Sequence, residues 1–140
     1  KRYVNFFEND PTLSLVNGVK ELIQFLHKQN LTLVLASSSA MVNINRVFSR
    51  FDLNKYFTAK ISGADLTASK PHPEIFEKAT ILGGVSKEHC IVVEDSDNGI
   101  KAANQAGVFV IGFKNPLSKD QTLINADLII ENFSELKKLL

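Results

Sequence analysis

The sequence predicts an α/β protein with a mostly parallel sheet that is covered by helices on both faces. From residue 19 onward, short apolar runs typical of buried strands alternate with segments of helical periodicity. This alternation indicates βαβ units, in which a helix connects one parallel strand to the next. A length of 140 residues favours a single domain with one core.

The composition narrows the classes of function. Sixteen Lys and Arg residues and fifteen Asp and Glu residues give a formal net charge of +1, and neither sign forms a long run. This balance argues against nucleic-acid binding and against electrostatic binding to membranes. No apolar stretch reaches the length of a membrane span, and nothing resembles a signal peptide. The single cysteine, Cys90, favours a reducing, cytoplasmic compartment, and we expect it in the core.

Apolar spacing predicts each element in the first part of the chain. The apolar residues of 19–26 fall at i, i+3, i+4 and i+7, which is one face of a helix. Residues 31–36 form a continuous apolar run, as in a strand buried on both faces. A second helix is expected over residues 41–51. Its expected buried positions include Val42, Val47 and Phe51.

The second part continues the alternation. Residues 59–62 predict a short strand, and 73–82 predict a helix that has proline in its first turn and a Gly-Gly pair at its end. Residues 90–93 form the next apolar strand, and 99–106 a helix of small residues that ends at a glycine. Two more strands and a final helix are expected at 108–113, 127–130 and 134–140.

Ligands of parallel sheets bind beyond the carboxyl ends of the strands, so polar residues at these ends are candidate site residues. Glu94 and Asp95 directly follow the strand at 90–93. Two adjacent carboxylates suit Mg²⁺, which binds one or two carboxylates together with phosphate oxygens. The alternative is structural: Glu94 is a solvated strand-end charge, and Asp95 or Asp97 caps the next helix.

Two further strand-end groups suit a phosphate. Ser37 and Ser38 follow the strand at 31–36, where hydroxyl and backbone N–H groups at a helix start can bind an anion. The alternative is a simple helix cap, with Ser39 as the capping residue. Lys70 lies in a loop that Pro71 and Pro73 stiffen, which could direct its ammonium group to the same place. A solvated lysine before a helix is the alternative.

Taken together, these segments resemble the haloacid dehalogenase superfamily, in its β-phosphoglucomutase-like branch of phosphatases and phosphomutases. LASSSA (35–40) resembles the second motif of the family, SKPHPEIF (69–76) the third, and VVEDSDNGIKAANQAG (92–107) the long and specific fourth. The resemblance implies a three-layer Rossmann-like core. It also implies a magnesium-dependent reaction on a small phosphorylated metabolite, a sugar phosphate.

The resemblance also assigns roles to individual residues. Ser37 would bind the transferring phosphoryl group, with backbone help from Ser38, and Lys70 would bridge that group and the nucleophile. Asp95 would bind magnesium, and Glu94 would do so directly or through water. Asn98 and Gly99 would shape the turn that follows.

The first motif of the family, a strand ending in an Asp-x-Asp pair, is absent from this sequence. The only aspartate before the serine motif is Asp10, which no apolar strand precedes. Residues 1–10 resemble the last helix of the family's helical cap. We therefore assign 1–14 to the end of the cap and the re-entry segment, and 15–140 to the core. The nucleophile strand, which lies at the centre of the sheet in the family, and most of the cap are expected to be missing.

This gap leaves three hypotheses about function. In the first, the chain is part of a longer enzyme that forms an aspartyl-phosphate on an Asp outside this chain. An upstream segment or a second chain then supplies the missing strand, and the 140 residues alone would be inactive. In the second, the chain is a non-catalytic remnant that only binds phosphate and metal. The third, a receiver-type phosphoacceptor domain, fits poorly because a receiver has its acidic pair early and its lysine late.

Overall fold

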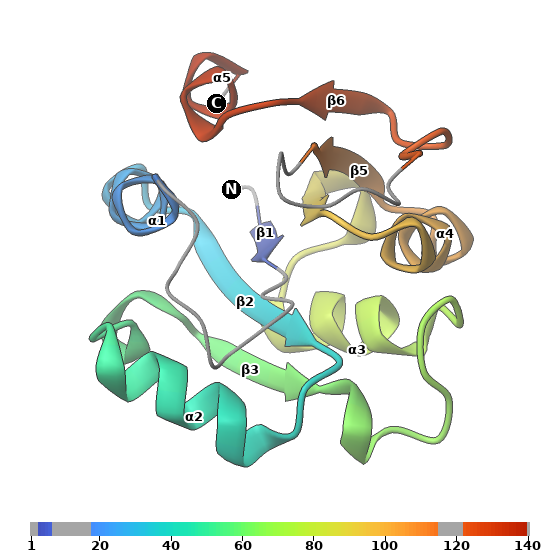
Figure 1. Cartoon of the computed structure of the whole chain (residues 1–140), viewed down its shortest axis with the longest axis horizontal. Helices are drawn as coiled ribbons and strands as arrows, with labels where there is room; N and C mark the ends of the chain where they lie inside the picture. The colour runs from blue at the N-terminus through green and yellow to red at the C-terminus, as the bar shows by residue number, and fades with distance from the viewer. Residues whose placement is uncertain (1–2, 7–17, 115–121, 140) are drawn as a thin grey trace.

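In the computed structural model, which describes residues 3–6, 18–114 and 122–139, six strands form one sheet. In chain order the strands are β1 (Tyr3–Phe6), β2 (Thr32–Ser37), β3 (Ala59–Ser62), β4 (Cys90–Glu94), β5 (Phe109–Phe113) and β6 (Leu128–Ile130). Their order across the sheet is β3-β2-β1-β4-β5-β6, and every neighbouring pair is parallel (Figure 1).

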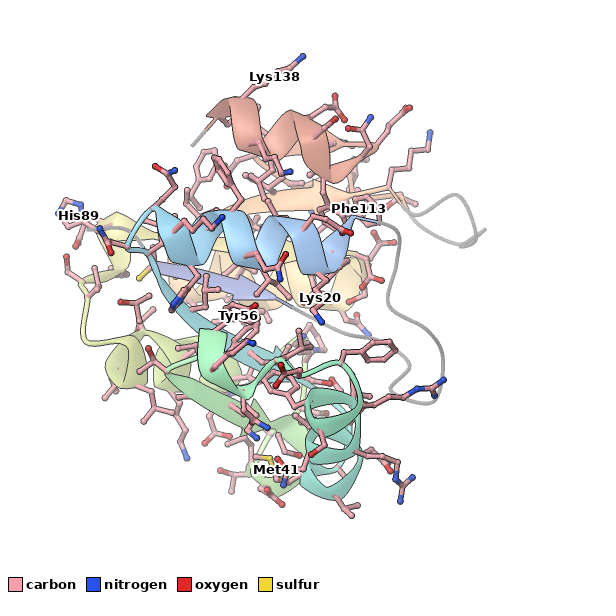
Figure 2. All side chains as sticks on the ribbon, turned by 90° about the vertical axis from the view of Figure 1, so that its left-hand side faces the viewer. Lys20, Met41, Tyr56, His89, Phe113 and Lys138 are labelled. Atoms are coloured by element: carbon pink, nitrogen blue, oxygen red, sulfur yellow. The ribbon has the colours of Figure 1, made fainter. Side chains whose placement is uncertain are left out.

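Helices cover both faces of this sheet. One face packs against α1 (Val19–Lys28), α2 (Met41–Arg50) and α5 (Phe133–Leu139), and the other against α3 (Glu74–Gly83) and α4 (Asp97–Ala106). Figure 2 shows the first face, with α1 in front of the sheet, α5 above it and α2 below. Short 3₁₀ turns η1 (Asn54–Tyr56), η2 (Gly63–Asp65) and η3 (Lys87–His89) lie in the connections. The three-layer α/β class is therefore confirmed.

Alternate residues of the central strands enter two separate cores. Leu35 and Val93 pack with α1, α2 and α5, whereas Ala36 and Val92 pack with α3 and α4. Because both faces are buried, the strands read as continuous apolar runs rather than as alternating ones. The same alternation places Glu94, one residue after Val93, on the face that carries α3 and α4.

The elements expected from residue 19 onward are confirmed, with ends that shift by one or two residues. The helix expected at 99–106 begins earlier, at Asp97, and Gly107 ends it with a φ of 76°. Cys90 is buried, as expected. Val42 was expected to be buried and is 63% exposed, because Ile44, Val47 and Phe48 form the buried face of α2.

The N-terminal expectation is wrong where the structure describes it. Tyr3–Phe6 forms a strand, not a helix, and β1 occupies the central position between β2 and β4 that we expected to be vacant. A vacancy there would leave the facing backbone N–H and C=O groups of β2 and β4 unpaired, and an extended segment satisfies both rows. Residues 1–2 and 7–17, with the proposed domain boundary at 14, lie outside the described residues.

No helix within the described ranges is long and apolar enough to cross a membrane.

Candidate functional site

Within the described part of the chain, the buried polar side chains lie at one edge of the sheet. They are Ser37, Ser62 and Glu94, the last residues of β2, β3 and β4. Ser62 pairs with Ser37 in the sheet register. Burial of polar groups is costly unless they are hydrogen-bonded, so this edge is where the fold retains polar chemistry.

The register also places Ser37 and Asp95 at the same level. Leu35 and Val93 both pair with Phe6 of β1, so Ser37 and Asp95 each lie two residues further on. They flank the end of β1 from either side. Two strand spacings separate their strands, which is about 10 Å. A small ligand bound beyond the end of β1 could therefore contact both.

Lys70 and Glu94 form a buried ion pair. The distance from Lys70 Nζ to Glu94 Oε2 is 2.8 Å, and the side chains are 5% and 0% exposed. The ammonium nitrogen also lies 5.1 Å from the centre of the Phe76 ring. The loop after β3 thus returns Lys70 to the carboxyl end of β4, as the sequence predicted.

The other oxygen of Glu94 organises the start of α4. Glu94 Oε1 accepts hydrogen bonds from the backbone N–H groups of Asp95 and Ser96, both at 3.2 Å, and from Ser96 Oγ at 3.0 Å. Ser96 Oγ in turn accepts the N–H of Gly99 at 3.0 Å and caps the helix. The alternative in which Asp95 or Asp97 caps this helix is therefore wrong, because Ser96 holds that position.

Gly99 allows Glu94 to occupy this place. A Cβ atom at Gly99 would lie 2.0 Å from Glu94 Cδ and 2.3 Å from Glu94 Oε2, which is too close for any side chain. The sequence predicted that Asn98 and Gly99 shape this turn. Gly99 lies directly against the carboxylate, whereas Asn98 is exposed in the first turn of α4.

The environment of Asp95 disfavours its negative charge. Burial raises its pKa to about 7, the neighbouring Glu94 adds to the rise, and the Lys70 ammonium opposes it only in part. A cation beside Asp95 would stabilise the ionised form. Among the described residues, no group of three His, Cys, Asp or Glu side chains could hold a metal without help. The donor set nevertheless fits Mg²⁺, which typically binds one or two carboxylates and takes its remaining ligands from water and phosphate.

The last residue of β2 and the two residues after it form a compact loop, which we call the serine loop (residues 37–39). Ser37 is 1% exposed, and its Oγ accepts the N–H of Ser39 at 3.1 Å, whereas Ser38 is exposed. Helix α2 begins at Met41 after an extended Ala40 without a side-chain cap, so the alternative in which Ser39 caps this helix is wrong. Ser62 Oγ donates to the carbonyl oxygen of Ser39 at 2.6 Å.

The loop that carries Lys70 is fastened to α3. Glu74 accepts hydrogen bonds from Thr67 Oγ1 at 2.8 Å and from the N–H of Ala68 at 3.1 Å. The Ala68 bond, followed by the Thr67 bond, lowers the pKa of Glu74 below its usual range. His72 Nδ1 accepts the N–H of Glu74 at 3.2 Å, and the Lys70–Pro71 peptide bond is cis.

Sequence reasoning missed the supporting residues Ser62, Ser96 and Glu74. The available signal for Ser62 was its position: like Ser37, it is a serine at the end of an apolar strand. Nothing in the local sequence indicated that Glu74 reaches back across the loop. The contact of Glu74 with Thr67 and Ala68 forms only when the loop folds back onto the start of α3.

The comparison with known proteins decides the family. The profile of haloacid dehalogenase-like hydrolases matches residues 1–113, which is most of the chain. The chain belongs to this family. The resemblance seen in the motifs is thereby confirmed, and the receiver-domain hypothesis is removed.

Several members of the haloacid dehalogenase-like family are similar to this chain. Hexitol phosphatase B of Escherichia coli K12 is 32% identical over 128 residues, which cover 91% of this chain and 58% of that protein. Beta-phosphoglucomutase of Bacillus subtilis is 32% identical over 122 residues, 87% of this chain and 51% of that protein. The crystal structure of CbbY from Rhodobacter sphaeroides in complex with phosphate superposes with a TM-score of 0.78 at 25% identity, covering 86% of this chain and 55% of that one. The chain thus spans little more than half the length of these relatives.

Proposed function

We propose that this chain forms the phosphate- and magnesium-binding core of a phosphatase or phosphomutase that acts on a small phosphorylated sugar in the cytoplasm. The observation that carries this proposal is the buried Lys70–Glu94 ion pair at the edge of the sheet where Ser37 and Asp95 also lie. Burying a lysine and a carboxylate rarely improves stability over apolar residues, so a buried pair at a strand-end edge favours a functional role. The names of the relatives support the sugar-phosphate substrate class.

The proposed roles follow the chemistry of each group. Ser37, with the backbone of Ser38, binds oxygens of the phosphoryl group, and Lys70 neutralises the charge that develops on it. Asp95 holds magnesium, and Glu94 contacts the metal directly or through water while it orients Lys70. Gly99 and Asn98 shape the turn that presents both carboxylates. Bound Mg²⁺ would supply positive charge to the phosphoryl oxygens.

The nucleophile is proposed to be an aspartate outside this sequence, which an upstream segment or a second chain places beyond the end of β1. No further strand is needed for this, because β1 already fills the central position of the sheet. Residues 7–10, which follow β1 in the chain, read Phe-Glu-Asn-Asp and contain no Asp-x-Asp pair. Attack by its carboxylate on phosphorus would form an aspartyl-phosphate while the phosphorus–oxygen bond to the sugar breaks, and the departing sugar oxygen would take up a proton. This intermediate splits one difficult displacement into two easier ones. Water or a second sugar hydroxyl would then attack the phosphorus and lose its proton, while the bond between phosphorus and the aspartate breaks and the free carboxylate returns.

The absence of an Asp-x-Asp pair also favours a second candidate, a protein that binds phosphate and metal without turnover. The two candidates share the ligands Ser37, Lys70 and Asp95 and differ only in the nucleophile. Binding measurements alone therefore do not separate them, and turnover does.

The test is a phosphatase assay of the natural polypeptide that carries this sequence, with hexitol phosphates and p-nitrophenyl phosphate, with and without Mg²⁺. We expect Mg²⁺-dependent turnover that falls by about 100-fold or more in Lys70→Ala, because a buried charge that stabilises the transition state is lost. Lys28→Ala is the matched control, since Lys28 is exposed at the end of α1. Phosphate binding without turnover would favour the second candidate, and neither binding nor turnover would overturn both.

A further inference from the structure

Ser62 is a buried serine to which the proposed chemistry gives no direct role. It is the last residue of β3, it is 2% exposed, and it pairs with Ser37 in the sheet. A buried hydroxyl is tolerated when it is hydrogen-bonded. The partners of Ser62 therefore indicate what it does.

Its hydroxyl joins two segments. Ser62 Oγ donates to the carbonyl oxygen of Ser39 at 2.6 Å and accepts the N–H of Ala64 at 3.2 Å. The serine loop is thus connected to η2, the turn after β3. Because Ser37 Oγ already accepts the N–H of Ser39, both backbone polar groups of Ser39 are held by serine hydroxyls.

The next residue shows that this contact is close. A Cβ atom at Gly63 would lie 3.3 Å from Ser38 Cα and 3.5 Å from the carbonyl oxygen of Ser37. A glycine at 63 therefore lets the turn support the serine loop at short range. The serine loop is therefore held at two places: it continues directly from β2, and the end of β3 contacts it.

We propose that Ser62 is a positioning residue for phosphate binding, which holds the serine loop in the conformation that presents Ser37 and Ser38 to a phosphoryl group. This inference rests on the proposed function of that loop. Binding to a preorganised loop avoids the entropic cost of ordering it at the moment of binding. Loss of the Ser62 hydroxyl leaves the Ser39 carbonyl and the Ala64 N–H without this partner, so the loop has to be ordered by the ligand instead.

The experiment measures the dissociation constant of inorganic phosphate in the presence of Mg²⁺ by titration calorimetry, in the natural polypeptide that carries this sequence. Ser62→Ala removes the hydroxyl, Ser62→Cys leaves a weak S–H donor, and Ser62→Thr keeps the hydroxyl. Ser49→Ala, at an exposed serine of α2, is the matched control. The melting temperature of every variant is recorded first. Binding is then measured at a temperature at least about 15 °C below the lowest of them, so that every variant is folded; a severe single mutation lowers the melting temperature by about this amount.

We expect Ser62→Ala to weaken phosphate binding about three- to tenfold, the range of one lost hydrogen bond. Ser62→Cys should lie between Ala and the natural residue, and Ser62→Thr should bind within about twofold of it because it keeps the donor. If Ser62→Ala does not fold, the comparison of phosphate affinity between Ser62→Cys and Ser62→Thr still tests whether the hydroxyl matters for binding.

Two results would overturn the inference, one against the role of Ser62 alone and the other against the proposed function as a whole. Equal phosphate affinity of folded Ser62→Ala and Ser49→Ala, or of Ser62→Cys and Ser62→Thr, shows that Ser62 supports only the fold. No phosphate binding by the unsubstituted protein overturns the proposed function, and the assignment of Ser62 with it.

Discussion

Gly99 shows how one residue controls the geometry of the site. Its missing side chain leaves the space that the buried carboxylate of Glu94 fills, with a hypothetical Cβ only 2.0 Å from Glu94 Cδ. Gly99→Ala therefore has to displace Glu94, which separates it from Lys70. Breaking a buried ion pair costs about 3–5 kcal/mol. We expect a loss of unfolding free energy of that size, measured by urea denaturation, together with loss of phosphate binding.

The control for this substitution lies on the same helix. Gln105→Ala changes an exposed position of α4 and should alter the unfolding free energy by less than about 0.5 kcal/mol. If Gly99→Ala were as stable as Gln105→Ala and still bound phosphate, the close packing of Glu94 on Gly99 would matter neither for stability nor for binding.

Single residues also show what the sequence could predict of the site. Ser37 and Asp95 were identified because polar residues at the ends of apolar strands are visible as a pattern, and Lys70 because prolines flank it in its loop. The structure places all three at one edge of the sheet. Their roles in catalysis stay predictions. Ser62 and Ser96 were missed because a serine next to a turn is common, and only the tertiary contact shows which atom its hydroxyl reaches.

At the scale of elements, the loop between η2 and α3 depends on one carboxylate of the helix. Glu74, in the first turn of α3, binds Thr67 and Ala68 and so holds the loop that carries Lys70. Glu74→Ala should increase the hydrogen-exchange rate of the Ala68 amide about three- to tenfold, because its hydrogen-bond acceptor is lost.

The same contact predicts a pH dependence. The pKa of Glu74 is lowered in the folded protein, so its stabilising effect is complete above the usual value of 4.5 and is lost as the pH falls through the folded pKa. Exchange of the Ala68 amide, corrected for its intrinsic pH dependence, should therefore become faster in acid. Glu77→Ala, at an exposed position of the same helix, is the control and should leave this amide unchanged. Equal protection of the Ala68 amide from hydrogen exchange in Glu74→Ala and Glu77→Ala would show that Glu74 does not hold this loop.

Elements differed in how well the sequence predicted them. Strands β2, β4 and β5 were visible because both their faces are buried, which leaves a continuous apolar run. Helix α4 began two residues earlier than predicted, since the capping residue is Ser96 and not an aspartate. Strand β1 was missed because its extended conformation comes from pairing with β2 and β4 on either side, which a local pattern of four residues does not reveal.

At the scale of the whole molecule, the parallel sheet determines the charge balance of the site. It brings Glu94, Asp95 and Lys70 to one edge, which sums to one negative charge when all three are ionised. A phosphate monoester would add further negative charge at the same place. Because unbalanced charge in a buried site is costly, we expect the proposed site to need a cation before it can hold a phosphate. A divalent cation at Asp95 would meet this need.

This balance predicts how global stability depends on pH. In the metal-free protein the pKa of Asp95 is raised from the usual 3.8 to about 7, mainly by burial. Between these values the folded protein keeps a proton that the unfolded chain releases, so the unfolding free energy falls as the pH rises from about 4 to about 7 and then levels off. Asp95→Asn is neutral throughout and lacks this dependence. Its stability advantage over the natural protein should therefore grow across this window.

Thermal unfolding from pH 4 to pH 8, with a chelator and then with Mg²⁺, measures both parts of this prediction. Mg²⁺ should raise the melting temperature of the natural protein more at pH 8 than at pH 5, because protons compete for Asp95 in acid, and it should not stabilise Asp95→Asn. Asp65→Asn removes an exposed carboxylate and is the control, which should keep the response to magnesium. Parallel pH profiles of the natural protein and Asp95→Asn would show that Asp95 does not titrate in this range. Equal stabilisation of both by Mg²⁺ would show that the metal binds elsewhere.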